Sequence, residues 1–289
     1  MIRFQTSAHG ELSESQRNAL LRLLTDDDPE VYHTVRDKIV AAGPQSVAWL
    51  KPHALSPDPV LRRRALSIIH QFESHAADNE FVAFCLSTGE DLPLEKGLWL
   101  LARTSFPEIN IDGYSALLDD MASELRLRLS GISNPRHALR AMRIFIFDDL
   151  HFAGDEEEYY NPDNSYLNRV IDRRLGNPIS LCTLYILLGR RLQLPITGIG
   201  LPGHFICRYQ TSSVELYIDA FKRGRLVTKG DCVQYLHESH FGLREEYISP
   251  QSPRRMLLRV CGNLHQIYAQ ALQTADATRF RRYMVALSR

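Results

Sequence analysis

The sequence predicts an α+β fold, in which an all-α N-terminal half precedes a half where helices pack on a small antiparallel sheet. Three observations predict this arrangement. Apolar residues follow a helical period through the N-terminal half as far as residue 150. Short β-rich segments bounded by turn residues follow between residues 196 and 227. Two amphipathic segments, 252–272 and 275–287, then end the chain as a predicted helix pair.

The composition is that of an ordinary globular protein. Of the 289 residues, 44% are apolar, and 34 basic side chains balance 34 acidic ones, so nothing points to nucleic acid. The N-terminus has no apolar signal region, and no segment approaches the length of a membrane span, so we expect a cytoplasmic protein with no membrane contact. The five cysteines are scattered without a Cys-x-x-Cys pair, and the histidines lack metal-ligand spacing, so we expect no disulfide, no metal and no cofactor.

Two N-terminal segments share one pattern at an offset of 30 residues. Segments 26–39 and 56–69 contain Asp-Pro at equivalent positions, Asp28-Pro29 and Asp58-Pro59, and continue with apolar residues at helical spacing. The shared stripe consists of Val31, Val35 and Ile39 in the first copy and Leu61, Ala65 and Ile69 in the second. A period of this size resembles stacked HEAT-type helix pairs. The alternative is two unrelated helices with the same cap; in either case 1–90 should be helical.

A loop then divides the chain. The helical pattern of 92–150 ends at the segment GDEEEYYNPDNSYL (154–167), in which successive glutamates repel and Asn-Pro-Asp-Asn is turn chemistry. We interpret the acidic run as a solvated loop rather than a metal site, because no histidine lies near it in sequence. The predicted domains are 1–90 (helical repeats), 91–250 (the mixed core with a helical leader) and 251–289 (the closing helix pair).

A buried helix should lie at the centre of the second half. A helix over 165–175, with Ser165 as candidate cap, precedes Gly176. Asn177 can then cap a new helix and Pro178 can occupy its first position. This helix, 178–192, is apolar nearly all round from Leu181 onward, which is typical of a helix enclosed on every side.

A predicted hairpin brings a histidine to an aspartate. Strands 204–209 and 214–219 flank a polar turn, and a two-residue loop at Thr211 and Ser212 would place His204 directly opposite Asp219. The carboxylate could then accept the Nδ1–H of the imidazole and fix its tautomer. A loop longer by one residue would instead send the two side chains to opposite faces.

An Asp-oriented histidine is half of a nucleophilic triad, which also needs a nucleophile at the exposed start of a helix. Cys182 is the cysteine on the preceding helix. The resulting order, with Cys182 on a helix followed by His204 and Asp219 on strands, resembles that of papain-like and transglutaminase-like enzymes. That resemblance implies an antiparallel sheet packed against the helix that carries the thiolate.

Two longer segments make the resemblance more specific. The run from Asn161 to Tyr209, followed by YIDAFKRG (217–224), is similar to the bacterial SirB-type proteins, a transglutaminase-like family with a helical N-terminal region and a tetratricopeptide-type tail. The similarity extends over about 92–270. Residues 1–90 resemble HEAT repeats instead, and the tail is reduced here to one tetratricopeptide-like helix pair.

The sequence departs from this pattern at the nucleophile. Gln193 stands where active transglutaminase-like cores have a glycine, and by that spacing the nucleophile position falls at or beside Pro178. Cys182 lies one turn further into an apolar helix, where burial raises the pKa of a thiol. It is therefore a core thiol, a displaced nucleophile or a pocket residue. Ser180 is an alternative nucleophile or an ordinary hydrogen-bonding residue of the helix start.

Two functions compete on these residues. In the first, the protein is a non-catalytic or weakly catalytic module that binds a protein or peptide. In the second, it is a cysteine hydrolase or acyl transferase with Cys182 as nucleophile, His204 as general base and Asp219 as the orienting carboxylate. We favour the binding module because the nucleophile is poorly placed. Arg173 and Arg174 could bind an anion in the cleft or pair with a helix end.

Overall fold

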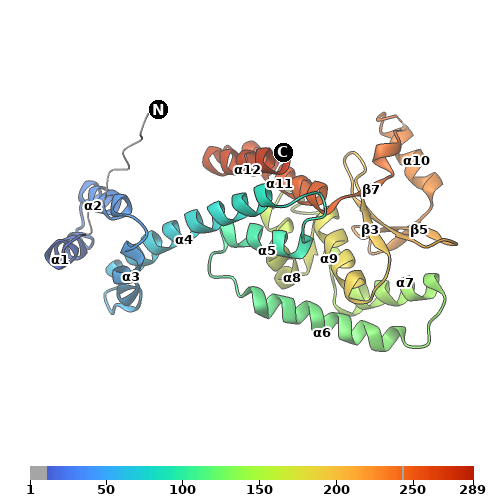
Figure 1. Ribbon diagram of the computed structural model, residues 1–289, viewed down its shortest axis with the longest axis horizontal. Coiled ribbons are helices and arrows are strands. Elements are labelled where there is room, and N and C mark those ends of the chain that lie inside the picture. Colours follow the sequence, from blue (N-terminus) through green and yellow to red (C-terminus); the bar gives the residue numbers. More distant parts are fainter. Residues whose placement is uncertain (1–11, 243) are drawn as a thin grey trace. The chain divides into compact units, whose positions relative to one another are not determined.

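The structure is a computed structural model, which describes residues 12–242 and 244–289 (Figure 1). The chain divides into two compact units. Among the described residues, the first unit holds 12–79 and 104–107, and the second holds 80–103 and 108–289. No helix in the described part of the chain combines the length and the apolar character needed to cross a bilayer.

The first unit is helical. It contains α1 (Glu14–Leu23), α2 (Pro29–Ala42), α3 (Ser46–Leu50), a 3₁₀ turn (Lys51–Leu55) and the beginning of α4 (Pro59–Ser87). The predicted caps are confirmed, because the Asp28 carboxylate accepts the Glu30 N–H at 2.9 Å and the Asp58 carboxylate accepts the Val60 N–H at 2.8 Å. Such caps satisfy N–H groups that have no partner within the helix.

The apolar stripes of the two sequence copies meet in one core. Val35, Ile39, Ala65 and Ile69 are buried in a single cluster, and Val31 and Leu61 pack against it. The predicted packing of these residues is therefore confirmed. Classification of this unit as HEAT-like stays a prediction.

The second unit combines helices with two sheets. Its helices are the end of α4, most of α5 (Leu94–Ser105), α6 (Ile111–Leu129), α7 (Pro135–Arg143), a π-helical turn (Ile144–Asp149), a 3₁₀ turn (Pro162–Asn164), α8 (Leu167–Arg173), α9 (Pro178–Arg191), α10 (Lys229–Glu238), a second 3₁₀ turn (Glu245–Tyr247), α11 (Pro253–Gln270) and α12 (Thr274–Leu287). The two-residue strands β1 (Ala153–Gly154) and β2 (Leu175–Gly176) form a parallel pair. This mixture confirms the predicted α+β class.

The main sheet is antiparallel and has the order β6-β5-β4-β3-β7. Its strands are β3 (Ile196–Ile199), β4 (Ile206–Gln210), β5 (Glu215–Asp219), β6 (Arg225–Val227) and β7 (Pro250–Gln251). Helix α9 packs against β3 and β4, while α11 and α12 form the closing pair (Figure 1). Every residue of α9 from Pro178 to Gly189 is buried, which confirms the predicted central helix.

One predicted cap in this unit was wrong. Ser165 does not begin a long helix, because the 3₁₀ turn over Pro162–Asn164 comes first and α8 starts only at Leu167 after Tyr166. The Ser165 hydroxyl instead accepts a hydrogen bond from the Asn177 side chain at 2.8 Å. A side-chain contact across the fold thus replaces the local cap that the sequence suggested.

Candidate functional site

The hairpin that carries Asp219 has a longer loop than the sequence suggested. Cys207 pairs with Ile218 and Gln210 pairs with Glu215, so the loop is the four residues 211–214 and the two-residue loop was wrong. The Thr211 hydroxyl stabilises this loop by accepting the Val214 N–H at 3.1 Å. The register moves by two residues, so Asp219 keeps its predicted face but is level with position 206 rather than with His204.

His204 nevertheless contacts Asp219. It lies on a tight turn before β4, in which Gly203 has φ +74° and the His204 N–H bonds to the Leu201 carbonyl at 3.1 Å. From this turn the ring reaches diagonally, and His204 Nε2 lies 2.9 Å from Asp219 Oδ2. The predicted hydrogen bond is confirmed, although it uses Nε2 rather than Nδ1 and joins a turn to a strand rather than two strands.

The second carboxylate oxygen of Asp219 is also bonded. Asp219 Oδ1 accepts the Lys222 backbone N–H at 3.1 Å, which fixes the carboxylate at the end of β5. Both side chains are largely shielded, with exposed fractions of 18% for His204 and 14% for Asp219. The Phe221 and Tyr235 rings lie within 6.4 and 6.1 Å of the imidazole. The contacts therefore hold the imidazole in one orientation.

A cavity of about 470 Å³ opens beside His204. Its walls come from the loop before α8, the start of α9, the turn before β4 and one face of α11. The lining residues are Tyr159, Tyr160, Asn177, Pro178, Ile179, Gly203, His204, Phe205, Arg259, Gly262, Asn263, Gln266 and Ile267. Of the three predicted triad residues, His204 alone is among these described lining residues, and Pro178 shares the cavity with it.

Cys182 is enclosed in the core between α9 and β4. Its side chain is completely buried, and its Sγ–H donates to the Phe205 carbonyl at 3.4 Å. The Cys207 thiol in turn donates to the Cys182 carbonyl at 3.5 Å. Burial, with Cys207 as a second cause, raises the pKa of Cys182 well above its ordinary value. The thiol is therefore protonated near neutral pH.

Ser180 belongs to the cap of α9. The Asn177 side chain accepts the Ser180 N–H at 3.0 Å, and the Ser180 hydroxyl accepts the Asn177 N–H at 3.0 Å. The hydroxyl also donates to the Asn177 carbonyl at 3.1 Å. In this reciprocal capping box the N–H and the hydroxyl of Ser180 are both hydrogen-bonded to Asn177, so Ser180 is a hydrogen-bonding residue of the helix start.

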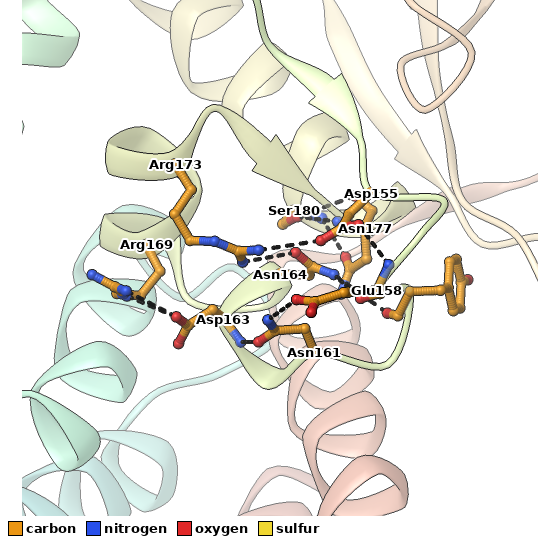
Figure 2. Close-up of polar contacts among 10 residues, drawn as sticks. Asp155, Glu158, Asn161, Asp163, Asn164, Arg169, Arg173, Asn177 and Ser180 are labelled. Atoms are coloured by element: carbon orange, nitrogen blue, oxygen red, sulfur yellow. Dashed lines mark hydrogen bonds and ion pairs between the residues drawn. The ribbon is translucent and has the colours of Figure 1, made fainter.

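The acidic segment before α8 is partly buried. Glu156 and Glu157 are exposed, as expected of a solvated loop. Asp155 is only 5% exposed, and its carboxylate lies 3.2 Å from the Arg173 guanidinium (Figure 2). Arg173 therefore neutralises a buried carboxylate. Its neighbour Arg174 has left-handed φ and lies over the Phe152 ring, so neither arginine of this pair lines the cavity.

A polar network connects this loop to the helix start. Arg173 donates to the Asn164 side-chain oxygen at 3.0 Å, and the Asn164 amide donates to the Glu158 carbonyl at 2.8 Å (Figure 2). The Asn177 N–H reaches the Asn164 carbonyl at 3.2 Å. Asn164 and Asn177 are both buried, so these bonds fix the loop that presents Tyr159 to the cavity.

Residues 112–262 match the transglutaminase-like superfamily. The chain belongs to this superfamily. Among the similar proteins, a UPF0162 protein of Xylella fastidiosa (strain 9a5c) is 34% identical over 197 residues, covering 66% of this chain and 70% of its own length. A UPF0162 protein of Pseudomonas aeruginosa is 27% identical, covering 65% and 68%. Human F-box only protein 21 is 33% identical over 134 residues, covering 44% of this chain but 21% of that protein. No solved structure matches the chain.

The transglutaminase-like match covers the main sheet and the cavity walls before α11, but it ends at residue 262, so the lining residues Asn263, Gln266 and Ile267 lie beyond it. In the part of the chain that the structure describes, no three His, Cys, Asp or Glu side chains gather as metal ligands would. Sequence reasoning missed several of the lining residues, and Arg259 is the charged one among them. It lies within an amphipathic helix, where an arginine is ordinarily a surface residue.

Proposed function

We propose that this protein is a SirB-type transglutaminase-like module that binds a peptide or protein segment in the cavity beside His204 and has little or no catalytic activity. The observation that carries this proposal is the composition of the cavity wall. The position where the resemblance puts the nucleophile falls at or beside Pro178, and the described lining residues include no cysteine, serine or threonine. A fold shared with enzymes does not by itself imply activity.

The cavity has groups that suit a peptide. Tyr159 and Tyr160 present partly exposed rings, which can cover apolar side chains. Asn263 and Gln266 carry amides that can bond to peptide N–H and C=O groups. The aromatic rings and the amides together could therefore accept a side chain and the backbone of a peptide.

The other parts of the proposal concern the two ends of the chain and the compartment. The HEAT-like N-terminal helices and the tetratricopeptide-like pair α11 and α12 would supply further surface for a protein partner. The five cysteines are all free and buried. Thiols that stay unpaired suit a reducing compartment, so we assign the protein to the cytoplasm.

A second candidate function rests on the bond between His204 and Asp219. A histidine oriented by a carboxylate and placed at a cavity wall is also the arrangement of a general base. In this alternative, Cys182 would attack an amide or ester carbonyl as in cysteine hydrolases and acyl transferases. The thiol would first have to leave the Phe205 carbonyl and lose its proton, both of which its burial opposes.

Incubation of the full chain with a synthetic pool of random tripeptides tests the proposal. We expect a subset of tripeptides to co-elute with the protein in gel filtration and to be recovered uncleaved, with the mass of the protein unchanged. The contrary result is cleavage of the pool or an acyl adduct on Cys182, either of them abolished by His204→Gln. A pool that does not co-elute at all would also count against a binding module.

A further inference from the structure

Arg259 gives the cavity a positive charge that no lining carboxylate neutralises. Its Nη2 donates to the Leu201 carbonyl at 3.1 Å and to the His204 carbonyl at 3.4 Å. Among the described residues, no protein acceptor bonds to Nε or Nη1, and the described lining includes no Asp or Glu. Burial lowers the pKa of Arg259, but an arginine guanidinium stays charged at neutral pH.

Further donors face the same space. Asn263 and Gln266 follow Arg259 by four and seven residues on α11, so the three side chains share one face of the helix. The start of α9 also lines the cavity, and the Ile179 N–H there has no bonding partner among the described residues, because the side-chain cap serves Ser180. The start of a helix carries partial positive charge, which adds to that of Arg259.

We propose that the cavity holds the carboxylate of a peptide, with Arg259 as its main partner and the adjoining apolar side chain against Tyr159, Tyr160 and Ile267. The proposal rests on the peptide-binding function above and names the group that is recognised. The Nε–H and Nη1–H groups of Arg259 remain available, and a charge-assisted hydrogen bond from either one to a carboxylate oxygen is stronger than a bond to a neutral acceptor. The carboxylate could be a peptide C-terminus or an Asp or Glu side chain.

The surroundings disfavour a polyanion such as nucleic acid. Glu157 and Glu158 directly precede the two tyrosines, and they line a neighbouring surface hollow together with them. Acidic residues beside the cavity repel a ligand that carries many negative charges, but they leave room for one carboxylate next to an uncharged chain. This charge pattern selects a peptide over a phosphate-rich ligand.

Titration of the ¹⁵N-labelled full chain with three small probes tests the proposal. N-acetyl-leucine carries an α-carboxylate, N-acetyl-leucinamide is its neutral counterpart, and N-acetyl-glutamate α-amide carries its carboxylate on the side chain. We expect saturable shifts of the Arg259 Nε–H and of signals at the start of α9 with at least one carboxylate probe. The neutral amide should bind about tenfold or more weakly, because charge-assisted hydrogen bonds are lost. The carboxylate probe that binds more tightly shows whether the cavity prefers a C-terminal carboxylate or a side-chain carboxylate.

Variants on α11 supply the matched controls. Arg259→Gln should weaken the carboxylate probe about tenfold or more, and Arg259→Lys should weaken it less because the charge is kept. Arg255→Gln, on an exposed part of the same helix, should leave binding unchanged. Arg259 also donates to the turn at His204, so Arg259→Gln could fail to fold. In that case the binding of N-acetyl-leucine relative to N-acetyl-leucinamide in the unaltered protein tests the proposal.

The proposal is overturned if the carboxylate and amide probes bind equally, if no probe gives a saturable shift at the cavity, or if Arg259→Gln folds and binds as before. These results differ from a failure of the proposed function. Equal binding of the two leucine probes, with intact tripeptides still retained, removes only the carboxylate assignment. Cleavage of the tripeptide pool by Cys182 would contradict the binding-module function. The tighter binding of N-acetyl-leucine than of N-acetyl-leucinamide would persist in that case.

Discussion

Arg173→Met should lower the free energy of unfolding by about 3 kcal/mol, because it leaves the Asp155 carboxylate buried without a counter-charge. The Asn164 side chain loses its bond to Arg173 in the same variant. Urea unfolding followed by fluorescence in a Trp49→Phe background measures the change, since Trp99 then reports on the second unit alone. Hydrogen exchange in the loop 155–164 should also accelerate.

Arg169→Met is the matched control on the same helix. Arg169 pairs with Asp163 at 2.9 Å, but these side chains are 35% and 27% exposed, so the pair is screened by solvent. We expect a loss of about 1 kcal/mol or less in this control. Equal losses in the two variants would contradict the assignment of the Asp155 and Arg173 pair as the bond that fixes this loop.

Arg254→Met should destabilise the second unit still more, by about 4 kcal/mol. Arg254 is 6% exposed and donates to the Cys85 and Thr88 carbonyls at the end of α4. It also donates to the Ala286 and Leu287 carbonyls at the end of α12. The last carbonyls of a helix have no partner within it, so methionine would leave buried acceptors unsatisfied at two helix ends.

Arg255→Met tests whether position rather than residue type causes this loss. Arg255 is the next residue of α11 and is exposed, so its replacement should change stability by no more than about 0.5 kcal/mol. The same urea experiment with Trp99 as the reporter compares the two. A small loss in Arg254→Met would mean that other donors or water can replace the guanidinium at both helix ends.

Local patterns in the sequence predicted the elements that local physics determines. Asp-Pro at the starts of α2 and α4 and Asn-Pro at the start of α9 are signals contained within a few residues, and all three helices begin there. The burial of α9 followed from its apolar circumference. The hydrogen bond between His204 and Asp219 was predicted for a hairpin with a shorter loop. It still forms, because a register change of two residues leaves the Asp219 side chain on the same face of the sheet.

Contacts between distant residues could not be predicted in this way. Arg254 donates to carbonyls of two other helices. Arg259 belongs to no sequence motif, and it stands out because the described residues that line its cavity include no carboxylate. The burial of Asp155 could not be predicted from the acidic run around it either, because its partner Arg173 lies on another element. Each depends on how helices pack, which a single sequence does not specify residue by residue.

The reactivity of Cys182 tests most directly whether the site is without a nucleophile. The chain and its His204→Gln variant are treated with iodoacetamide at pH 6 and pH 7, and mass spectrometry of the peptides reports each cysteine separately. Because burial raises the pKa of Cys182, we expect slower labelling than that of free cysteine at pH 7, as for the buried Cys232, whose pKa is raised to about 11. The rate at Cys182 should not depend on His204. Labelling of Cys182 faster than free cysteine at pH 6, and lost in His204→Gln, would contradict the binding-module account and establish the thiol as the nucleophile of a cysteine hydrolase.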